Sequence, residues 1–538
     1  EHAIARLTSM LEIYCTPGSG RWYENVACYY QQSLKCWCNL AIHLARHGLL
    51  DPASVPRMKE FLSWGIIALT APLPADYAVM REGVDADTYR TLPKTRRIPP
   101  IGDHAHLGSW VPEHVAIMAH FFRESDPAFA DFLRWAFHSS GADGGYYSVP
   151  QLFFTQADAL DMTPPEGDFT LASRRLEGFG VVFRGNVNQE DEFYLLLKQG
   201  PGGYRYHRTE GSILLVADGK PLVYDGGEAG EAWRHTTLSF YDTHTMLAPG
   251  HVERFHSFPT VDFAQGVHPL ALSPGEPDYL CNSCRHELVE VAYQRYNEPH
   301  PADIRSVIWV KDAYVILHDE LHIDPAIPTH WHLQAVAQHE TGDLQEGFRF
   351  AGRFGTDLQV LLPGVAGHAT VEYVPIVEPY MPPDVCFGMR HLQVSGTPGT
   401  DHYLAVLRPL PAGGTPVQAT PIHHGGLTVG VMVLGVGVAD RLFFHHDGMA
   451  IEEGDLYAFS GRYGAVLQRP DGLALALLDG ACLTAANITL SSTGPAAWLQ
   501  VTEQAVTLVT EGRGEIVVQY QGIEHRVNCP GEQQTIQL

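Results

Sequence analysis

Cysteine is scarce in this chain, which has nine cysteines among its 538 residues. Cys281 and Cys284 form a CxxC pair, but the sequence has no second CxxC to complete a four-cysteine zinc site. Cys28, Cys36 and Cys38 fall in a stretch with helical periodicity, where a thiol packs as a small apolar side chain. This odd and sparse set does not predict a disulfide framework.

Basic residues are also few. Lys and Arg number 35 against 61 Asp and Glu, which gives a formal net charge of −26. A chain this acidic repels a phosphate backbone, so nucleic acid is not an expected partner. The same charge would hinder binding of an acidic polymer unless the binding cleft is locally basic, and the overall charge does not exclude such a cleft.

Long hydrophobic runs are absent. The sequence has no stretch of about 18 apolar residues, so we expect no membrane-spanning helix and no membrane partner. It also has no signal-peptide pattern and begins with Glu1 rather than Met. These two features lead us to expect that an N-terminal piece has been removed.

What the sequence does contain fits a folded protein of several domains. Its length predicts about three domains. Hydrophobic residues make up 45% of the chain and charged residues 18%, which is typical of an ordered globular protein. The 52 glycines and 37 prolines favour a turn-rich and largely β structure.

Residues 1–145 show helical periodicity. Leu34, Trp37, Ala41 and Leu44 give one predicted helix an apolar stripe, and Gly48 is its C-terminal stop. Residues 90–110 form a Pro-rich, locally basic loop that is suited to face a polyanion. Helices are predicted at 4–14, 25–46, 55–69, 111–122 and 128–137.

From about Tyr146 the pattern changes to short strands separated by Gly, Pro and Asp turns. His330 and His332 alternate with Trp331, so we expect them on a solvent-facing side of a strand rather than in a metal site. Strands are predicted at 180–184, 192–198, 306–317, 329–337, 427–438, 465–467, 473–478 and 505–520. The fold class is therefore α+β and multidomain: a helical domain over 1–145, a central antiparallel β-sandwich over 146–410 and a C-terminal β domain over 411–538.

One predicted hairpin, within residues 204–227, brings ionisable groups to its open end. Its first strand is the apolar run 213–216, Asp218-Gly219 is the turn, and 221–224 returns. In a strict two-residue hairpin, residue 225 faces Ser212, about 16 Å along the strand from residue 207. For Asp225 to come closer to His207, the chain must bend near Gly211, and glycine permits such a bend. The polar groups at this end are Arg205, His207, Arg208, Glu210 and Asp225, and His235 and His244 follow.

The pattern His-x-x-Glu-Gly-Ser, then PLVYDGG, then Trp233-Arg234, resembles the heparinase II/III-like polysaccharide lyases. The resemblance implies one divalent metal, zinc with a structural role, held by His207, Asp225 and His244, with His235 as the competing third ligand. Neutral imidazoles and one carboxylate also suit zinc chemically. The alternative reading of the residues alone makes His207 a surface-loop histidine and Asp225 the start of a turn. The chain departs from the family at Arg205, where a second histidine is common, and at Thr245, where asparagine is common.

A second motif, Glu24-Asn25-Val26-Ala27-Cys28-Tyr29, matches the family's Glu-polar-x-x-x-Tyr pattern at a helix start. The resemblance implies that Tyr29 transfers a proton during catalysis. Tyr30 continues the apolar stripe of its helix, which favours a place in the core. His104 lies in the element IGDHAH and is the other candidate catalytic residue. The candidate substrate-binding residues are Glu24, Asn25, Tyr30, Arg205, Arg208, Glu210 and His235.

The resemblance implies β-elimination at a uronic acid of an acidic polysaccharide or oligosaccharide, glycosaminoglycan-like or alginate-like. It further implies an α/α toroid, a secreted or periplasmic location and possible homo-oligomers. The family's Asn-His element has no match before Tyr29, so we expect an incomplete toroid and lower activity than a longer chain would have. Two alternatives stay open: a glycoside hydrolase that uses paired carboxylates such as Glu24 and Asp103, and a non-catalytic carbohydrate-binding protein.

Overall fold

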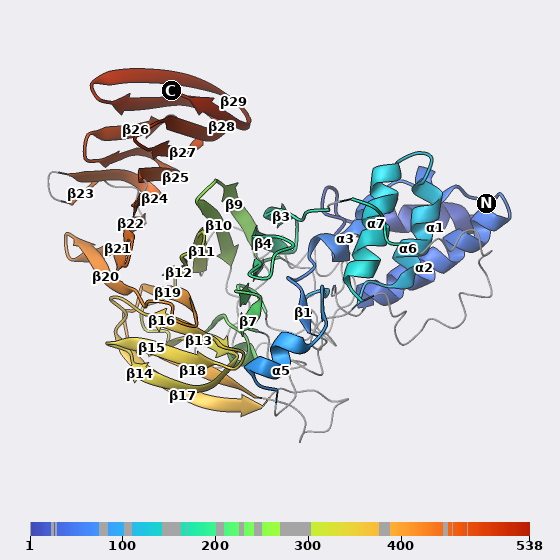
Figure 1. Ribbon diagram of the computed structural model, residues 1–538, viewed down its shortest axis with the longest axis horizontal. Coiled ribbons are helices and arrows are strands. Elements are labelled where there is room, and N and C mark those ends of the chain that lie inside the picture. Colours follow the sequence, from blue (N-terminus) through green and yellow to red (C-terminus); the bar gives the residue numbers. More distant parts are fainter. Residues whose placement is uncertain are drawn as a thin grey trace.

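The computed structural model describes residues 2–22, 26, 29–74, 84–101, 110–141, 163–167, 169–200, 209–224, 231–240, 250–268, 303–375, 388–444, 450–453, 456–470 and 472–538. In this part of the chain, a group of helices packs against the first of three large antiparallel sheets (Figure 1). The three sheets are stacked face to face, with a shared core between each neighbouring pair. The predicted α+β architecture, with helices before the sheets, is confirmed.

The helices occupy the N-terminal part, as predicted. Leu34, Trp37 and Ala41 are buried along one side of α2, and Gly48 follows that helix with a left-handed φ of 65°. The predicted stripe and stop are therefore confirmed. The described helices are α1 (His2–Tyr14), α2 (Tyr29–Arg46), α3 (Met58–Ile67), α5 (Ala86–Thr91), α6 (Glu113–Phe122) and α7 (Pro127–Ser139), with 3₁₀ turns η1 (Pro52–Ser54) and η4 (Ala232–Arg234).

A nine-stranded sheet carries the helices on one face. Side chains along β6 alternate between two cores, as a strand requires. Leu214 and Val216 point toward the helical core, and Ile213 and Leu215 point into the β-sandwich. The strand order is β17 (Gly367–Pro375), β18 (Gly388–Gly396), β13 (Thr329–Ala335), β7 (Lys220–Val223), β6 (Ile213–Ala217), β5 (Phe193–Lys198), β4 (Gly180–Gly185), β3 (Arg174–Leu176), and β8 (Leu238–Phe240) pairs with β13.

The second sheet lies between the other two, so both of its faces are covered. Every residue of β11 and β12 is buried, and their apolar side chains are shared between the two cores on either side. The order of this eight-stranded sheet is β14 (Ala337–Asp343), β15 (Gly347–Gly352), β16 (Thr356–Leu361), β19 (His402–Pro411), β12 (Tyr314–Leu321), β11 (Asp303–Val310), β10 (Val261–His268) and β9 (His251–Ser257). The single strand predicted at 306–317 is wrong. A turn with Asp312 at φ 59° divides it, and a run that is apolar on both faces hides such a turn.

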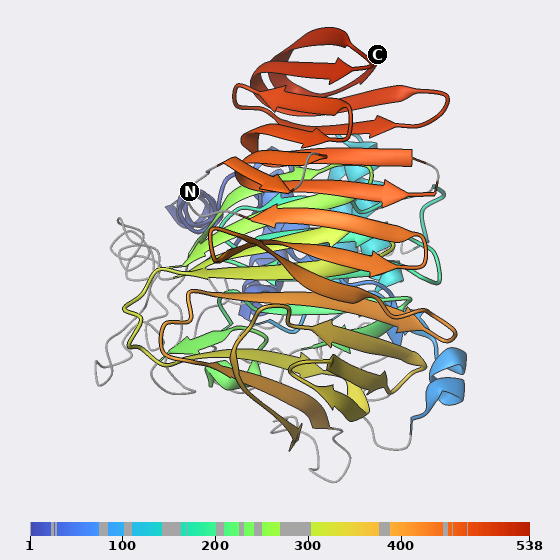
Figure 2. The same ribbon diagram turned by 90° about the vertical axis from the view of Figure 1, so that its left-hand side faces the viewer.

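The third sheet has ten strands and contains the C-terminus. Figure 2 shows its long strands β28 and β29 in red at one end of this sheet, beside the C-terminus. Its strands are β20 (Gln418–His424), β21 (Leu427–Gly435), β22 (Val438–Phe444), β23 (Ala450–Glu453), β24 (Tyr457–Arg469), β25 (Gly472–Ala485), β26 (Ile488–Ser492), β27 (Ala496–Val501), β28 (Val506–Tyr520) and β29 (Ile523–Gln537). The short strands β1 (Leu73–Pro74) and β2 (Lys94–Thr95) pair separately.

The hairpin of β6 and β7 turns at Asp218-Gly219, as predicted. Both residues have left-handed φ values, 52° and 64°, which is the geometry of a type I′ turn. A bulge between Leu215 and Val216 shifts the pairing by one residue, so that Val223 lies opposite Leu215 instead of Leu214. The strict two-residue register predicted from the sequence is therefore wrong beyond the first pairs of the ladder.

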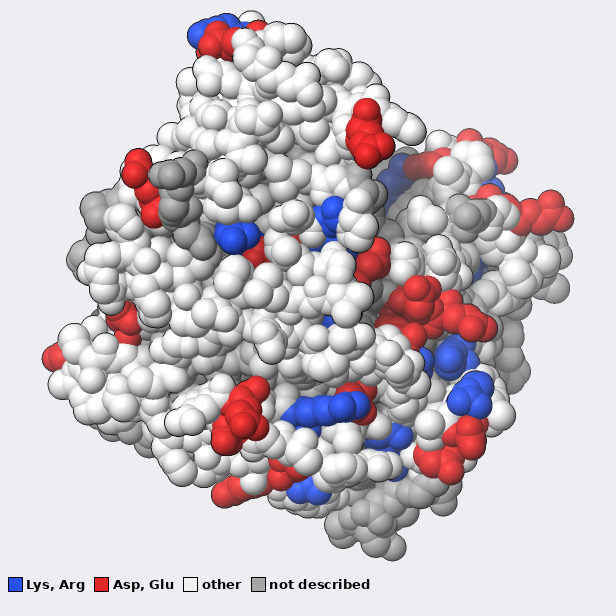
Figure 3. All heavy atoms as spheres, turned by 60° about the vertical axis from the view of Figure 1, so that its left-hand side comes forward, with Lys and Arg blue, Asp and Glu red and all other residues white. Residues whose placement is uncertain are grey.

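The surface shown in Figure 3 has acidic and basic side chains in small scattered groups, often side by side. This face therefore carries no broad region of one charge. Among the helices that the structure describes, none combines the length and apolar character needed to cross a membrane.

Candidate active site

Four of the predicted site residues belong to the described part of the chain: Tyr29, Tyr30, Glu210 and His235. The others lie outside the described residues, namely Glu24, Asn25, His104, Arg205, His207, Arg208, Asp225 and His244.

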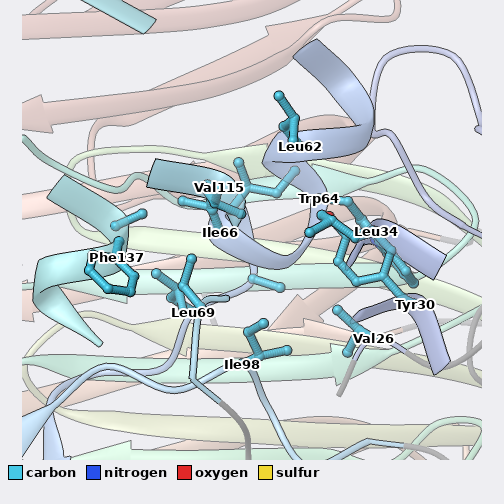
Figure 4. Close-up of a cluster of buried hydrophobic side chains, with 14 of the residues drawn as sticks. Val26, Tyr30, Leu34, Leu62, Trp64, Ile66, Leu69, Ile98, Val115 and Phe137 are labelled. Carbon is cyan, nitrogen blue, oxygen red and sulfur yellow. The ribbon is translucent and has the colours of Figure 1, made fainter. Parts of the chain in front are cut away.

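Tyr29 and Tyr30 occupy the first turn of α2 but differ in burial. Tyr29 is half-buried, whereas Tyr30 is 1% exposed and packs edge-on against Phe61 and Trp64. The Tyr30 hydroxyl donates to the carbonyl of Phe61 at 2.5 Å, and burial raises the pKa of this phenol. Figure 4 shows Tyr30 among Val26, Leu34 and Trp64 in the helical core. The core position predicted for Tyr30 is confirmed, and a role in substrate binding does not fit it.

Glu210 lies in the turn three residues before β6, where it is 1% exposed and forms an ion pair with the buried Lys198 at 2.5 Å. Its other carboxylate oxygen accepts from the backbone N–H of Gly200 at 2.9 Å and of Gly250 at 3.2 Å. Gly200 precedes the segment that contains His207, and Gly250 follows the segment that contains His244. Glu210 thus joins the ends of both segments from inside the protein, and its burial does not fit the predicted contact with substrate.

The chain bends where β6 begins. Gly211 has a left-handed φ of 73°, and the N–H of Ser212 donates back to the carbonyl of Thr209 at 2.9 Å. The chain therefore does bend at Gly211, as a close approach of residues 207 and 225 would require. A Cβ atom at this position would lie 3.3 Å from the Thr237 hydroxyl and 3.4 Å from the His268 ring, so there is little room for a side chain. Both the backbone conformation and the limited space therefore favour glycine here.

A buried arginine holds this bend in place. The guanidinium of Arg305 binds both oxygens of Asp319, at 2.5 and 2.8 Å, and both side chains are fully buried. The remaining nitrogen of Arg305 donates to the carbonyls of Gly211 at 2.5 Å and Thr236 at 3.0 Å. This arginine therefore connects the turn before β6 to the segment before β8.

His268 and Asp303 form a second buried pair beside the first. They face each other across β10 and β11, and the imidazole Nδ1 lies 3.0 Å from the carboxylate. Burial raises the pKa of Asp303 to about 7 and lowers the pKa of His268 to about 3, although Glu210 partly opposes the second shift. At neutral pH the imidazole is thus neutral in the folded protein.

A row of histidines lies on the helix-facing side of the nine-stranded sheet. Nδ1 of His332 is 3.0 Å from Nε2 of His391, and its Nε2 is 2.9 Å from the Ser239 hydroxyl. His330, on the same side of β13, is 2.8 Å from the Ser395 hydroxyl. The expected solvent-facing position is wrong for His332, which is fully buried: Trp233 of η4 lies on this side of the sheet, its ring 5.3 Å from that of His391 and its carbonyl 2.7 Å from the Gln334 amide.

His235 is fully buried at the end of η4. It is one of the neighbouring charges that lower the pKa of His332, after burial itself and His391, so it lies close to the histidine row. In the part of the chain that the structure describes, no three His, Cys, Asp or Glu side chains are arranged to hold a metal ion. His235 is thus part of the buried polar layer in this structure, and its proposed contact with substrate does not fit.

Sequence reasoning missed Lys198, Arg305, Asp319 and His391. For the first three, a usable signal exists: each is a charged residue at or near one end of a strand that is apolar over most of its remaining length. A charge in such a strand implies a buried partner, because an unpaired buried charge is too costly. The sequence has no signal for the partner itself, since pairing depends on which strands become neighbours.

The histidine row predicts a pH-dependent stability. Burial, with a smaller contribution from Arg234, lowers the pKa of His391 to about 4. Between about pH 4 and the unfolded value of about 6.5, the unfolded chain binds a proton that the folded chain does not. The free energy of unfolding should therefore fall as the pH drops through this window, by up to about 1.4 kcal/mol per pH unit for this one histidine.

Urea unfolding across the same window measures this slope. The variant His391→Gln removes the titrating group, so its slope should be smaller than that of the parent by about the contribution of one proton. An identical slope in the two proteins would contradict the assignment.

No protein-family model matches the chain, and no curated protein matches it by sequence. Solved structures do match. Heparan sulfate lyase HepC from Pedobacter heparinus superposes with a TM-score of 0.52 at 12% identity, over 80% of this chain and 59% of that chain. A heparinase III gene product gives a TM-score of 0.52 at 13% identity, over 80% and 59%. Another heparinase III structure gives 0.51 at 12%, over 80% and 60%.

The chain thus spans about 60% of the length of each of these structures. At such low identity the superposition concerns the fold, and the fold is that of a helical region packed against stacked antiparallel sheets. The resemblance noted in the sequence is borne out at this level: the chain shares the fold of the heparinase III and heparan sulfate lyase structures.

Proposed function

We propose that this protein is a polysaccharide lyase that cleaves an acidic, uronate-containing polysaccharide by β-elimination, with heparan sulfate-type glycosaminoglycans as the first substrate class to test. The observation that carries the proposal is the fold shared with heparan sulfate lyases, together with a half-buried tyrosine, Tyr29, at the start of α2 where the lyase motif has its tyrosine.

The chemistry explains the residue types. The proton at C5 of a uronic acid lies next to a carboxylate, and it becomes acidic when the negative charge of that carboxylate is neutralised. A base then removes the proton, the C4–O bond breaks, and an acid supplies a proton to the departing oxygen. In this proposal Tyr29 performs proton transfer, while Arg205 and Arg208 bind the carboxylate as bidentate donors. His104 is the second candidate for a proton-transfer or charge-neutralising role.

The buried residues described above would support this site. Glu210, through Lys198 and the N–H groups of Gly200 and Gly250, ties together the ends of the two segments that carry His207 and His244. Arg305 holds the bend at Gly211, the residue that follows Glu210 in the chain, by donating to its carbonyl. These contacts support the proposal because they anchor the flanking backbone in one arrangement.

We further propose that His207, Asp225 and His244 hold one zinc ion. Two imidazoles and a carboxylate fit zinc by their chemistry, and Glu210 anchors the described ends of two of the three segments. The ion would supply a fixed link between the hairpin and the neighbouring loops, and it would contribute to stability rather than to the chemical step.

Elemental analysis is therefore expected to find about one zinc per chain, and the variant His207→Ala should lose it. Removing the metal with a chelator should lower the melting temperature by several degrees, because binding free energy contributes to folding free energy. A protein purified without metal and unaffected by added zinc would contradict the site.

The substrate class is tested with a panel of polymers: heparan sulfate, chondroitin sulfate, alginate and a neutral glucan. Elimination leaves an unsaturated uronate that absorbs ultraviolet light. We expect this absorbance with heparan sulfate and none with the neutral glucan. Absorbance with alginate alone would reassign the substrate, and no absorbance with any polymer would reject the lyase proposal.

A further inference from the structure

A polar pocket of about 530 Å³ lies where the helices meet the β-sandwich. Its walls come from the end of α5, from β2, from α7, and from the turns that follow β4 and β6. Figure 1 shows α5 and β1 between the helices and the sheets, and Figure 2 shows α5 at one edge of the stack. Of the candidate site residues that the structure describes, none lines this pocket.

The back wall of the pocket is a buried cluster of charged side chains joined by hydrogen bonds. Arg96 binds both oxygens of Glu192 at 2.7 Å, and both side chains are almost fully buried. Arg96 also donates to the carbonyl of Thr70 at 3.1 Å and to the amide oxygen of Asn188 at 2.8 Å. The buried Arg184 lies 3.9 Å from the same carboxylate, so this layer holds two arginines and one glutamate and carries a net positive charge.

Two exposed cations and one exposed carboxylate line the rest of the pocket: Arg90, Lys94 and Glu190. Arg90 is 3.0 Å from Asp87, but both side chains are strongly exposed, and such pairs contribute little. Lys94 lies over the ring of Tyr89, 5.4 Å from its centre. Asp87 still offsets the charge of Arg90, so the small positive excess around the pocket comes from the buried layer, in a protein whose net charge is −26.

An aromatic face completes the pocket. Trp135 is half-buried, is stacked on Phe132 with ring centres 5.7 Å apart, and has the guanidinium of Arg96 5.8 Å from its ring. A sugar ring can pack its C–H groups against such a fixed aromatic surface, while neighbouring cations bind acidic substituents. An aromatic wall beside basic residues matches an acidic sugar better than an apolar ligand.

The pocket is remote from the candidate active site. Gly219, in its lining, lies at the far end of β6 from Gly211. The five residues of β6 between the two turns span roughly 16 Å. A polymer bound at one place could extend to the other, whereas a short oligosaccharide could not occupy both.

We propose that this pocket is an accessory subsite for an acidic sugar, bound through its carboxylate or sulfate by Arg90 and Lys94 and through its ring by Trp135. The inference rests on the proposed function for its polymeric substrate. The subsite holds a distant part of the polymer, so it lowers the KM for long chains and leaves kcat unchanged.

The test uses three single variants with exposed side chains. Lys94→Gln should weaken the binding of heparan sulfate by about threefold to tenfold, and Glu190→Gln should strengthen it by about twofold to threefold, because it removes a repulsive charge. The matched control is Arg526→Gln, which removes one exposed cation on β29 in the third sheet and should leave the affinity within about twofold. Isothermal titration gives the affinities, and thermal melts confirm that each variant is folded.

Two further arms separate the possible outcomes. Desulfated heparan sulfate retains its carboxylates. If Lys94→Gln weakens the binding of this polymer as well, Lys94 binds a carboxylate; if the loss of affinity disappears, Lys94 binds a sulfate. If elimination occurs and Lys94→Gln does not raise the KM for the polymer, the subsite is wrong while the lyase proposal stands. If no elimination occurs but the opposite effects at Lys94 and Glu190 are found in binding, the subsite stands and the lyase proposal fails. Equal effects of Lys94→Gln and Arg526→Gln would overturn the inference.

Discussion

Replacing Tyr29 with phenylalanine is expected to lower the rate of elimination by about 10²-fold to 10⁴-fold. The variant loses only one hydroxyl oxygen, the group that the proposal assigns to proton transfer. Because Tyr29 is half-buried at the first residue of α2 and is not part of the buried cluster around Tyr30, the fold should be retained. The measurement is the initial rate of absorbance increase with the preferred polymer, accompanied by a thermal melt.

The neighbouring tyrosine provides the matched control. Tyr30→Phe removes the same group from the adjacent position but breaks the buried hydrogen bond to the carbonyl of Phe61. We expect a loss of about 1 kcal/mol in the free energy of unfolding and an almost unchanged rate. If the Tyr29 and Tyr30 variants have the same activity as the parent, Tyr29 is not the proton-transfer residue.

Breaking the Arg305–Asp319 pair should produce the largest loss of stability. Asp319→Asn leaves a fully buried guanidinium without its counter-charge, which typically costs about 3–5 kcal/mol. The same change should weaken the two hydrogen bonds from Arg305 to the carbonyls of Gly211 and Thr236, because the guanidinium is no longer held in place by Asp319. Chemical denaturation of the two proteins under identical conditions measures the difference.

An exposed pair serves as the comparison. Asp87→Asn breaks the contact with Arg90, where both side chains are strongly exposed, so the loss should be well below about 1 kcal/mol. Equal losses for Asp319→Asn and Asp87→Asn would show that the buried network does not stabilise the fold in the way proposed.

Local patterns were sufficient to predict the layers of this fold. The apolar stripe through Leu34, Trp37 and Ala41 identified α2 and separated Tyr29 from Tyr30, because helical spacing assigns side chains to faces. Alternation and turn residues located β4 and β5, and Asp218-Gly219 identified the hairpin of β6 and β7. Each of these features depends on residues close together in the chain.

The interior of the candidate site could not be predicted in the same way. Glu210 meets Lys198 and Gly250, and Arg305 meets Gly211, only because strands distant in sequence become neighbours. Periodicity assigned His332 to the correct face of β13, but it does not reveal that Trp233 of η4 lies on that face. The bulge in the hairpin was also missed, since neither Leu215 nor Val216 differs in character from its neighbours.

The central claim is that the protein breaks its polymer by elimination. The most direct measurement follows ultraviolet absorbance and new reducing ends in the same reaction with heparan sulfate, for the parent and for Tyr29→Phe. Elimination predicts that both signals rise together in the parent, one unsaturated end for each new reducing end, and that both nearly vanish in the variant. Reducing ends without absorbance would instead identify a hydrolase, and binding without either signal would identify a carbohydrate-binding protein, and both results would contradict the account.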